Sequence, residues 1–466
     1  MILKYSKYSS LALLFTLGCS GEETQDTVPI HMSATFSKTG VSAVSTWDDS
    51  FRLAADDASE GLAAAGYPTG KHLSFDILVA DTKNDVTITV ERAIEMVQQQ
   101  GAKVVINGTS SDTGALGKLA YDDDAANDLS VPIMCVACSS PALHNPTNVN
   151  ADAAIQSTNR NEEGWIFGLA MSSLPQASVL WNILVDQTPT GGVPGDLNGD
   201  GQVKISTIAL DDGFGIGFQD AMQQVVATQA PTAIFEKIRH PKDASPDTYD
   251  WESDINQMTD TLTDGVADVA PDVVIEFTFP QFSLALVKAY SSNIPFLHTH
   301  SMREKTVVLS AEGHLDGQDG TSYLPSDGVS GQMFDDRFRD VIEISRQSQW
   351  DSGVYDAAFL FALGAVHATQ EMEDPSLVTG EAIRDAMKLL NDPDGEVIRI
   401  GPEEFAKAAA AIADGRPINY EGASGPVDFD AYGRAKNRIS HWRVENGVAS
   451  DVAVYDCIAN ASCPKM

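Results

Sequence analysis

Basic residues are scarce in this chain. Its 466 residues include 30 Lys and Arg against 66 Asp and Glu, which gives a formal net charge of −36 at pH 7. A surface with this charge repels phosphate backbones and anionic lipid headgroups, so we expect no nucleic-acid partner. A solvated acidic surface accounts for most of the carboxylates, and halophilic adaptation or bound divalent cations would fit as well.

Catalytic signatures and long apolar runs are also missing. The sequence has no G-x-S-x-G elbow, no H-E-x-x-H pair, no Walker A loop and no spaced Cys–His nucleophile pair. No run beyond the N-terminus reaches the roughly 20 apolar residues that a transmembrane helix needs. We therefore expect a protein that is not an enzyme and that does not span a membrane.

The N-terminus resembles a bacterial lipoprotein signal. Two lysines precede a short apolar run, Leu11–Leu17, and Cys19 follows shortly after it. Thr16 stands where such signals usually have Leu, so the match is imperfect. The pattern predicts a signal peptide over residues 1–19, an acyl chain on Cys19 and a polar tether over residues 20–28. The expected location is the cell envelope, on the periplasmic side of the membrane or at the cell surface, with the lipid as the only membrane contact.

Cysteine is rare, with five residues in the chain. Cys457 and Cys463 flank a short loop near the C-terminus, and in an oxidising compartment this spacing predicts a local disulfide. Cys135 and Cys138 form a C-x-x-C pair without a thioredoxin-like context and without a second cysteine pair for zinc. This second pair is either a small-loop disulfide or two buried thiols.

Strand-like and helix-like segments alternate along the chain. This order predicts an α/β architecture with mostly parallel sheets. The length favours more than one domain, and the strand–helix rhythm restarts in the second half, which predicts two similarly wound lobes. The expected strands cover residues 28–36, 73–80, 104–107, 131–136, 203–210 and 273–277, and the expected helices cover residues 47–65, 86–100, 114–126 and 217–228.

One segment near the C-terminus is especially informative. Residues 417–433 contain the run YEGASGPVDFDAYG, whose glycines and proline predict a tight turn next to short strands. The run resembles the C-terminal segment of type I periplasmic binding proteins of the leucine/isoleucine/valine (amino-acid) family, the substrate-binding components of ABC transporters. Further matches, which extend over about residues 28–455, are Phe36-Ser-Lys-Thr-Gly, Gly108-Thr-Ser-Ser, Cys138-Ser-Ser-Pro-Ala-Leu and Asp211-Asp-Gly-Phe-Gly-Ile-Gly.

The resemblance implies a division of the chain. It predicts two doubly wound parallel-sheet lobes joined by a three-strand hinge. The first lobe would comprise residues 28–158 and 340–415, and the second lobe residues 159–339 and 416–466. The YEGASG run would then contain the third crossing between the lobes.

Polar side chains follow two of the predicted strands. Ser110 and Ser111 come after one strand, and Ser139 comes after the next. Ligands of open α/β sheets bind at the carboxyl ends of strands, where helix N-termini present N–H groups, so these positions suit a carboxylate. Helix capping would explain the same serines without any ligand. The resemblance implies that the three serines hold the carboxylate of an amino acid and that the backbone carbonyl of Ala137 accepts from its ammonium group.

Aromatic and acidic residues complete the expected site. The resemblance places an aromatic residue over the ligand at Phe214. Trp47, near the start of the first helix, is either a second apolar wall or part of the core. The family also supplies an acid from the second lobe, for which Asp250 and Glu276 are the candidates. Neither matches the family pattern cleanly, which leaves open whether the ligand is an amino acid.

A short acidic loop resembles the start of a calcium site. Asp196, Asn198, Asp200 and Gly201 occupy positions 1, 3, 5 and 6 of an EF-hand pattern. Position 12 is Thr207 instead of Glu, and a predicted strand follows in place of a helix. The loop is therefore either a weak structural calcium site or an Asx-rich turn.

Together these features lead to a functional expectation. We expect a monomeric extracytoplasmic solute-binding lipoprotein that captures a small polar ligand, an amino acid or a related carboxylate, between two lobes. The resemblance implies that it delivers this solute to ABC permease subunits. No cofactor is required, and calcium is the one ion that the sequence suggests. The alternatives are a ligand-sensing receptor module of the same fold and a calcium-dependent surface or adhesion lipoprotein.

Overall fold

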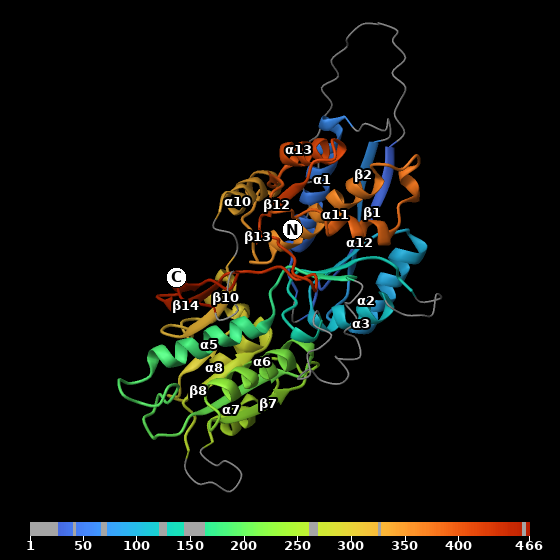
Figure 1. Ribbon diagram of the computed structural model, residues 1–466. Coiled ribbons are helices and arrows are strands. Elements are labelled where there is room, and N and C mark those ends of the chain that lie inside the picture. The colour runs from blue at the N-terminus through green and yellow to red at the C-terminus, as the bar shows by residue number, and fades with distance from the viewer. Residues whose placement is uncertain are drawn as a thin grey trace, which may run out of the picture.

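Two sheets with flanking helices form two lobes, one above the other in Figure 1. The computed structural model describes residues 27–40, 43–66, 72–120, 128–143, 164–260, 269–324, 328–458 and 463–466. The predicted signal peptide, Cys19 and most of the predicted tether therefore lie outside the described residues. In the part of the chain that is described, no helix is both long and apolar enough to cross a membrane.

The first lobe contains a five-stranded parallel sheet with the order β2-β1-β3-β4-β5. Every residue of the three shortest strands is buried, as expected for a parallel sheet that helices cover. The strands predicted at residues 28–36 and 73–80 are confirmed to within one residue. The strands are β1 (Thr27–Phe36), β2 (His72–Asp81), β3 (Val105–Asn107), β4 (Ile133–Cys135) and β5 (Ile166–Gly168).

One helix, α11 (Asp351–Thr369), is the centre of the first lobe. Nearly all of its 19 residues are buried, because the segment is apolar on every side. It packs against α1, α12 and α13. The other helices of this lobe are α1 (Trp47–Ala65), α2 (Val86–Ile94), α3 (Ser110–Ala120), α10 (Val329–Ile342), α12 (Gly380–Met387) and α13 (Pro402–Ala413). A small sheet of β11 (Glu396–Ile398), β12 (Ile418–Gly422) and β13 (Gly425–Pro426) completes the lobe.

The second lobe contains a seven-stranded sheet with the order β15-β14-β10-β9-β8-β6-β7. Its core strands are parallel, and the two C-terminal strands add an antiparallel edge. The strands are β6 (Lys204–Leu210), β7 (Ile234–His240), β8 (Val273–Phe277), β9 (Phe296–His298), β10 (Asp319–Tyr323), β14 (Ile439–Glu445) and β15 (Val448–Tyr455). The helices are α5 (Ser173–Gln187), α6 (Gly213–Gln229), α7 (Trp251–Met258), α8 (Pro280–Ala289) and α9 (Lys305–Ser310).

The chain passes between the lobes three times, and each crossing lies at a different position from the one that we expected. The first crossing follows β5, which still pairs with β4, whereas we expected it at residue 158. The second precedes α10, which packs on α1 and β12, whereas we expected it at residue 340. The third lies between β13 and β14, whereas we expected it at residue 416. Strands of two or three residues carry no periodic pattern, so the sheet that they join could not be predicted.

The run YEGASG folds around a buried carboxylate of α11. Asp356 Oδ1 accepts hydrogen bonds from the Tyr420 hydroxyl at 2.7 Å and from the Ala423 N–H at 2.8 Å. Its Oδ2 accepts from the Ser424 N–H at 2.7 Å and from the Ser424 hydroxyl at 2.5 Å. A Cβ atom at Gly422 would lie 2.5 Å from the same Oδ2, so glycine is required there. The run therefore closes the first lobe ahead of the third crossing, a correction to its expected role.

Both cysteine pairs lie close together. The Cα atoms of Cys457 and Cys463 are 4.3 Å apart, and those of Cys135 and Cys138 are 5.6 Å apart. The second distance is within the usual range for disulfides of about 4.4–6.8 Å, and the first is at its lower edge. The placement agrees with the local disulfide predicted at the C-terminus, and it favours a small-loop disulfide over two separate thiols for the C-x-x-C pair.

Candidate ligand-binding site

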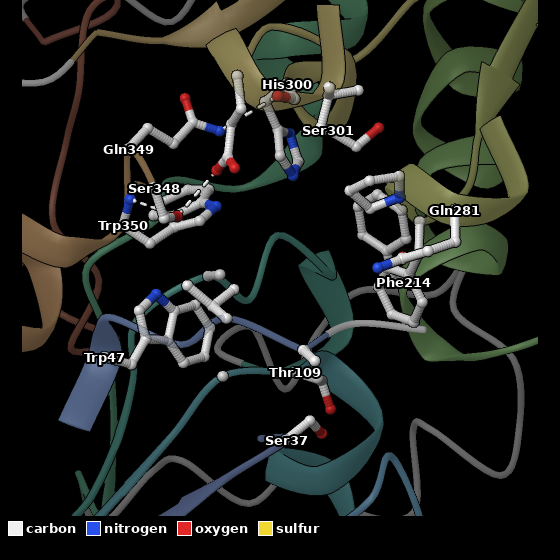
Figure 2. A pocket seen from close by; sticks show the side chains of 18 of the residues that line it. Ser37, Trp47, Thr109, Phe214, Gln281, His300, Ser301, Ser348, Gln349 and Trp350 are labelled. Atoms are coloured by element: carbon white, nitrogen blue, oxygen red, sulfur yellow. Dashed lines mark hydrogen bonds between the residues drawn. The ribbon is translucent and has the colours of Figure 1, made fainter. Parts of the chain in front are cut away.

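A cavity of about 200 Å³ lies between the two lobes (Figure 2). An apolar cavity of about 150 Å³ already holds benzene, so this volume suits a small solute. The first lobe contributes residues at the carboxyl ends of β1, β3 and β4 and at the starts of α1 and α3. The second lobe contributes the starts of α6 and α8 and the segment between β9 and α9. The turn Ser348–Trp350, directly before α11, completes the lining.

Hydroxyl groups and a helix N-terminus form the first-lobe side. Helix α3 begins at Ser110, so the N–H groups of its first turn create a positive potential at the cavity. Thr109 Oγ1 accepts from the Asp112 N–H at 3.2 Å, and Ser110 Oγ accepts from the backbone N–H of Ser140 at 3.4 Å. A Cβ atom at Gly108 would clash with the ring of Trp47, so this glycine lets the tryptophan reach the cavity. This side can bind an anionic group.

Aromatic rings form the other walls. Phe214 stacks on Phe279 with ring centroids 5.6 Å apart and planes 11° apart. The ring of His300 meets Phe214 edge-on at 5.6 Å and meets Trp350 at 5.5 Å with planes at 89°. Figure 2 shows Trp47 and Trp350 on one side of the hollow and Phe214 on the other. The walls therefore favour a ligand with an apolar body.

A strip of hydrogen bonds joins the lobes beside the cavity. Asp351 Oδ1 accepts from the Thr46 hydroxyl at 2.7 Å, and its Oδ2 accepts from the Ser348 N–H at 3.0 Å. The Ser348 hydroxyl donates to Glu304 Oε1 at 2.8 Å, a bond drawn in Figure 2. Thr46 and Ser348 lie within two residues of the two tryptophans of the cavity. The strip therefore ties the backbone next to both tryptophans to the Glu304 carboxyl.

Burial controls the charge of the groups at the cavity. It raises the pKa of Glu304 to about 7 and that of Asp351 to about 6. The same effect lowers the pKa of His300 to about 3, so its imidazole is neutral at pH 7. Around neutral pH the cavity thus has a neutral histidine and a carboxyl that gains or loses a proton readily.

These raised pKa values predict a pH-dependent stability. For Glu304 and Asp351 the folded-state pKa lies above the unfolded value, so the folded chain binds more protons between about pH 4 and pH 7. Their stabilisation is complete below this window and is lost as the pH rises through it. Between pH 5 and pH 7.5 these two carboxyls should lower the free energy of unfolding of the ligand-free protein by roughly 3 kcal/mol. The lowered pKa of His300 acts in the opposite direction, so the contribution of the carboxyls is measured by urea unfolding as the difference from a variant that lacks both of them.

The control is the double variant Glu304→Gln with Asp351→Asn. It removes both titrating groups and should reduce the difference between the two pH values by about the same amount. A difference that stays as large as in the unmodified protein would contradict the assignment to these two carboxyls.

A protein family described as periplasmic binding protein matches residues 29–417. The chain belongs to this family. Membership confirms the resemblance found at the sequence level and the two-lobed α/β fold, and it agrees with the prediction of a binding protein that is not an enzyme. Proteins of this family are extracytoplasmic binding components for small molecules, so the chain is a solute-binding protein of the periplasmic type.

Solved structures of similar fold cover nearly the whole binding protein. A leucine-binding protein from Thermotoga maritima is 12% identical with a TM-score of 0.61, over 91% of this chain and 98% of its own. A branched-chain amino acid transporter substrate-binding protein from Streptococcus pneumoniae, in complex with isoleucine, is 14% identical with a TM-score of 0.60, over 91% and 99%. A solute-binding protein of an ABC transporter from R. palustris, in complex with benzoate, is 13% identical with a TM-score of 0.62, over 94% and 97%. No curated protein matches the sequence. At these identities the similarity shows the fold, and only the residues of the site bear on the identity of the ligand.

Four of the predicted ligand residues meet at the cavity of the binding protein. Ser110 and Ala137 line its first-lobe side, Trp47 lines one wall, and Phe214 lines the opposite wall. Three of the four come directly after strands, where the rule for open α/β sheets located them. Their part in ligand binding stays a prediction.

Two predicted serines lie elsewhere. Ser111 Oγ donates to Asp212 Oδ2 at 3.2 Å and accepts from the Gly213 N–H at 3.1 Å, so it bridges α3 to α6 of the other lobe. Ser139 is fully buried outside the cavity lining, and its carbonyl accepts from the Ser173 N–H at 2.8 Å. Successive residues of a helical turn point in different directions, so Ser110 and Ser111 cannot both face one ligand.

Neither candidate acid reaches the cavity. Glu276 is fully buried inside the second lobe, where Oε2 accepts from the Ser283 hydroxyl at 2.8 Å and Oε1 lies 3.3 Å from His298 Nδ1. Asp250 caps α7 at an exposed position and accepts from the Ser253 N–H at 3.4 Å. The prediction that Asp250 or Glu276 supplies the second-lobe acid is therefore wrong, and the second-lobe acid that lines the cavity is Glu304.

Sequence reasoning also missed residues at the cavity. Glu304 and His300 follow β9 at its carboxyl end, so the rule that selected Ser110 could have found them. Trp350 comes from the turn before α11. No local signal places this turn at the cavity, because its position depends on the path of the chain between the lobes.

The predicted calcium loop directs its oxygen atoms at its own backbone. Asp196 accepts from the Gly199 N–H at 2.6 Å and from the Gly201 N–H at 2.9 Å, and Asn198 Oδ1 accepts from the Asp200 N–H at 2.9 Å. Across the described ranges, no group of three or more His, Cys, Asp or Glu side chains is placed to hold a metal ion. This geometry is that of an Asx-rich turn, and calcium binding stays a prediction.

Proposed function

We propose that this protein is a lipid-anchored solute-binding protein that captures a small amino-acid-like carboxylate between its lobes and delivers it to an ABC permease. The observation that supports this most is the cavity itself, which receives side chains from both lobes at the carboxyl ends of the first-lobe strands. Closure of the lobes buries the solute, and opening releases it to the permease. The acyl chain on Cys19 holds the monomer at the membrane, where the permease lies.

We assign the two ends of the ligand to different parts of the cavity. The Ser110 hydroxyl and the first-turn N–H groups of α3 hold the carboxylate. Glu304 of the second lobe neutralises the positive end, and the backbone carbonyl of Ala137 in the first lobe accepts from any N–H that this end carries. The bodies that close are those that the two sheets define, residues 27–168 with 329–433 and residues 173–323 with 439–466.

Calorimetric titration with amino acids and small carboxylates tests this proposal. We expect one solute to bind at a ratio of one per chain. Ser110→Ala should weaken its binding about tenfold, because a hydrogen bond to a charged group is lost. The control is Ser376→Ala, at an exposed serine outside the cavity, which should leave the affinity unchanged. Failure of every such solute to bind, or equal affinity of the Ser110→Ala variant, would contradict the proposal. Uptake of labelled solute by cells with and without the protein tests delivery.

A further inference from the structure

The ionisable groups at the cavity are unbalanced in sign. Asp112 and Glu304 are carboxyls, and the one imidazole, His300, is neutral at pH 7. Among the described residues that line the cavity there is neither Lys nor Arg. A ligand with only a negative charge would meet two carboxyls and no cationic side chain. A ligand that also has a positive end would supply the missing charge for Glu304.

Aromatic rings surround the place where this positive end would lie. The Ser348 hydroxyl, which donates to Glu304 at 2.8 Å, also accepts from the backbone N–H of Trp350 at 3.1 Å, so one serine contacts both the carboxyl and the backbone of this tryptophan. The ring of Trp350 lies 5.5 Å from that of His300, and His300 comes four residues before Glu304 in the chain. Trp47 lies on the same side of the hollow (Figure 2). Faces of Trp rings attract cations and are the usual walls of sites for alkylated ammonium groups.

A primary ammonium group fits these surroundings less well. It has three N–H donors, and each needs an acceptor when water is removed. One oxygen of Glu304 is already occupied by Ser348. The nearest lining residues on either side in the chain are Ser301, whose hydroxyl is paired with that of Thr299 at 3.2 Å, and Thr306, which is exposed. His300 and Val307, next to them, present a ring and methyl groups. An alkylated ammonium group has few or no N–H donors to satisfy. Its methyl groups pack on the rings while its charge faces the carboxyl.

We propose that the ligand is a small zwitterion whose positive end is an N-alkylated ammonium group, held by Trp47, Trp350 and Glu304. This inference rests on the proposed function, because the carboxylate of the same ligand occupies the N-terminus of α3. The cavity of about 200 Å³ accommodates a trimethylammonium group with a short carboxylate chain. The selectivity comes from the ring faces and the Glu304 carboxyl.

A pair of isosteric probes isolates the charge. Trimethylglycine and 3,3-dimethylbutanoate have the same shape, but the first has a positive nitrogen where the second has carbon. Leucine is the third probe and carries a primary ammonium group. In calorimetric titrations of the full-length mature protein, trimethylglycine should bind at least about tenfold more tightly than either of the others. Equal or tighter binding of 3,3-dimethylbutanoate or leucine would overturn the inference and leave the proposed function standing.

Two variants test the residues. Glu304→Gln should weaken the binding of trimethylglycine at least about fivefold and should not weaken that of 3,3-dimethylbutanoate by more than about twofold, because only the first probe has a positive charge that this carboxyl attracts. Trp350→Phe keeps a ring at this position and should weaken trimethylglycine less than Trp350→Leu does. The same loss for both probes in Glu304→Gln would refute the assigned role of this carboxyl. If none of the three probes binds, the inference is wrong, and the wider panel of solutes decides the proposed function separately.

Discussion

Asp356→Ala is expected to destabilise the first lobe by about 4 kcal/mol. The carboxylate is fully buried and accepts four hydrogen bonds from three residues of the YEGASG run, Tyr420, Ala423 and Ser424. Alanine would leave these donors buried without an acceptor, and each such donor costs about 1–3 kcal/mol. Urea and thermal unfolding of the ligand-free protein measure the loss. Because α11 is the central helix of the lobe, we also expect reduced yields of folded protein.

A matched control separates this network from a general effect of removing an acid. Asp56 is an exposed aspartate on α1 of the same lobe, and Asp56→Ala should change the free energy of unfolding by less than about 0.5 kcal/mol. A double-mutant cycle with Gly422→Ala adds a second check. The added methyl group would collide with the Asp356 carboxylate, so it should cost less in the Asp356→Ala background. A loss in Asp356→Ala as small as in the control would show that the run does not depend on this carboxylate.

The sequence was sufficient for several of the longer elements and for part of the first-lobe side of the cavity. The helix predicted at residues 47–65 and the strand predicted at 273–277 match the structure. The apolar pattern of each segment was enough to predict whether it forms a helix or a strand. The hydroxyl groups after β3 were found for a similar reason, since ligands gather where parallel strands end. The YEGASG run was identified by its similarity to a family sequence. Its partner Asp356 lies more than 60 residues away, and no local pattern connects the two.

The remainder of the site depended on the way the lobes meet. Glu304 and Trp350 come from segments that approach only after the chain has crossed between the lobes, so their spacing in the sequence carries no information about their contact. Ser111 is the opposite case, a residue that the sequence placed at the ligand and that the structure places in a contact between the lobes. Its position after a strand suited a ligand, but the approach of α6 turned it into a contact between lobes. A residue at such a cleft has two possible partners, the ligand and the opposite lobe, and only the three-dimensional structure distinguishes them.

The contact between α3 and α6 leads to the second large expected effect. Gly213 and Gly217 lie one turn apart on α6, so they share one face of the helix. A Cβ atom at Gly213 would lie 3.3 Å from Ser111 Oγ, and one at Gly217 would lie 2.9 Å from Ser140 Oγ and 3.2 Å from Ser140 Cα. The two glycines therefore let the lobes approach closely. We expect Gly217→Val to weaken ligand binding about 100-fold, because the closed arrangement can no longer form without displacing backbone.

This effect should appear in affinity and leave stability intact. Valine has a higher helix propensity than glycine, so Gly217→Val should not lower the free energy of unfolding of the ligand-free protein. Gln223→Val, at an exposed position of the same helix, is the control and should bind as the unmodified protein does. Small-angle scattering in the presence of ligand should give a larger radius of gyration for Gly217→Val than for the control, since a ligand stabilises only the state that it binds more tightly. If the variant binds normally and becomes as compact as the control, the close approach at α6 is not required for capture. If it unfolds more readily, the glycine serves the packing of the second lobe instead, and closure must depend on the strip from Asp351 to Glu304.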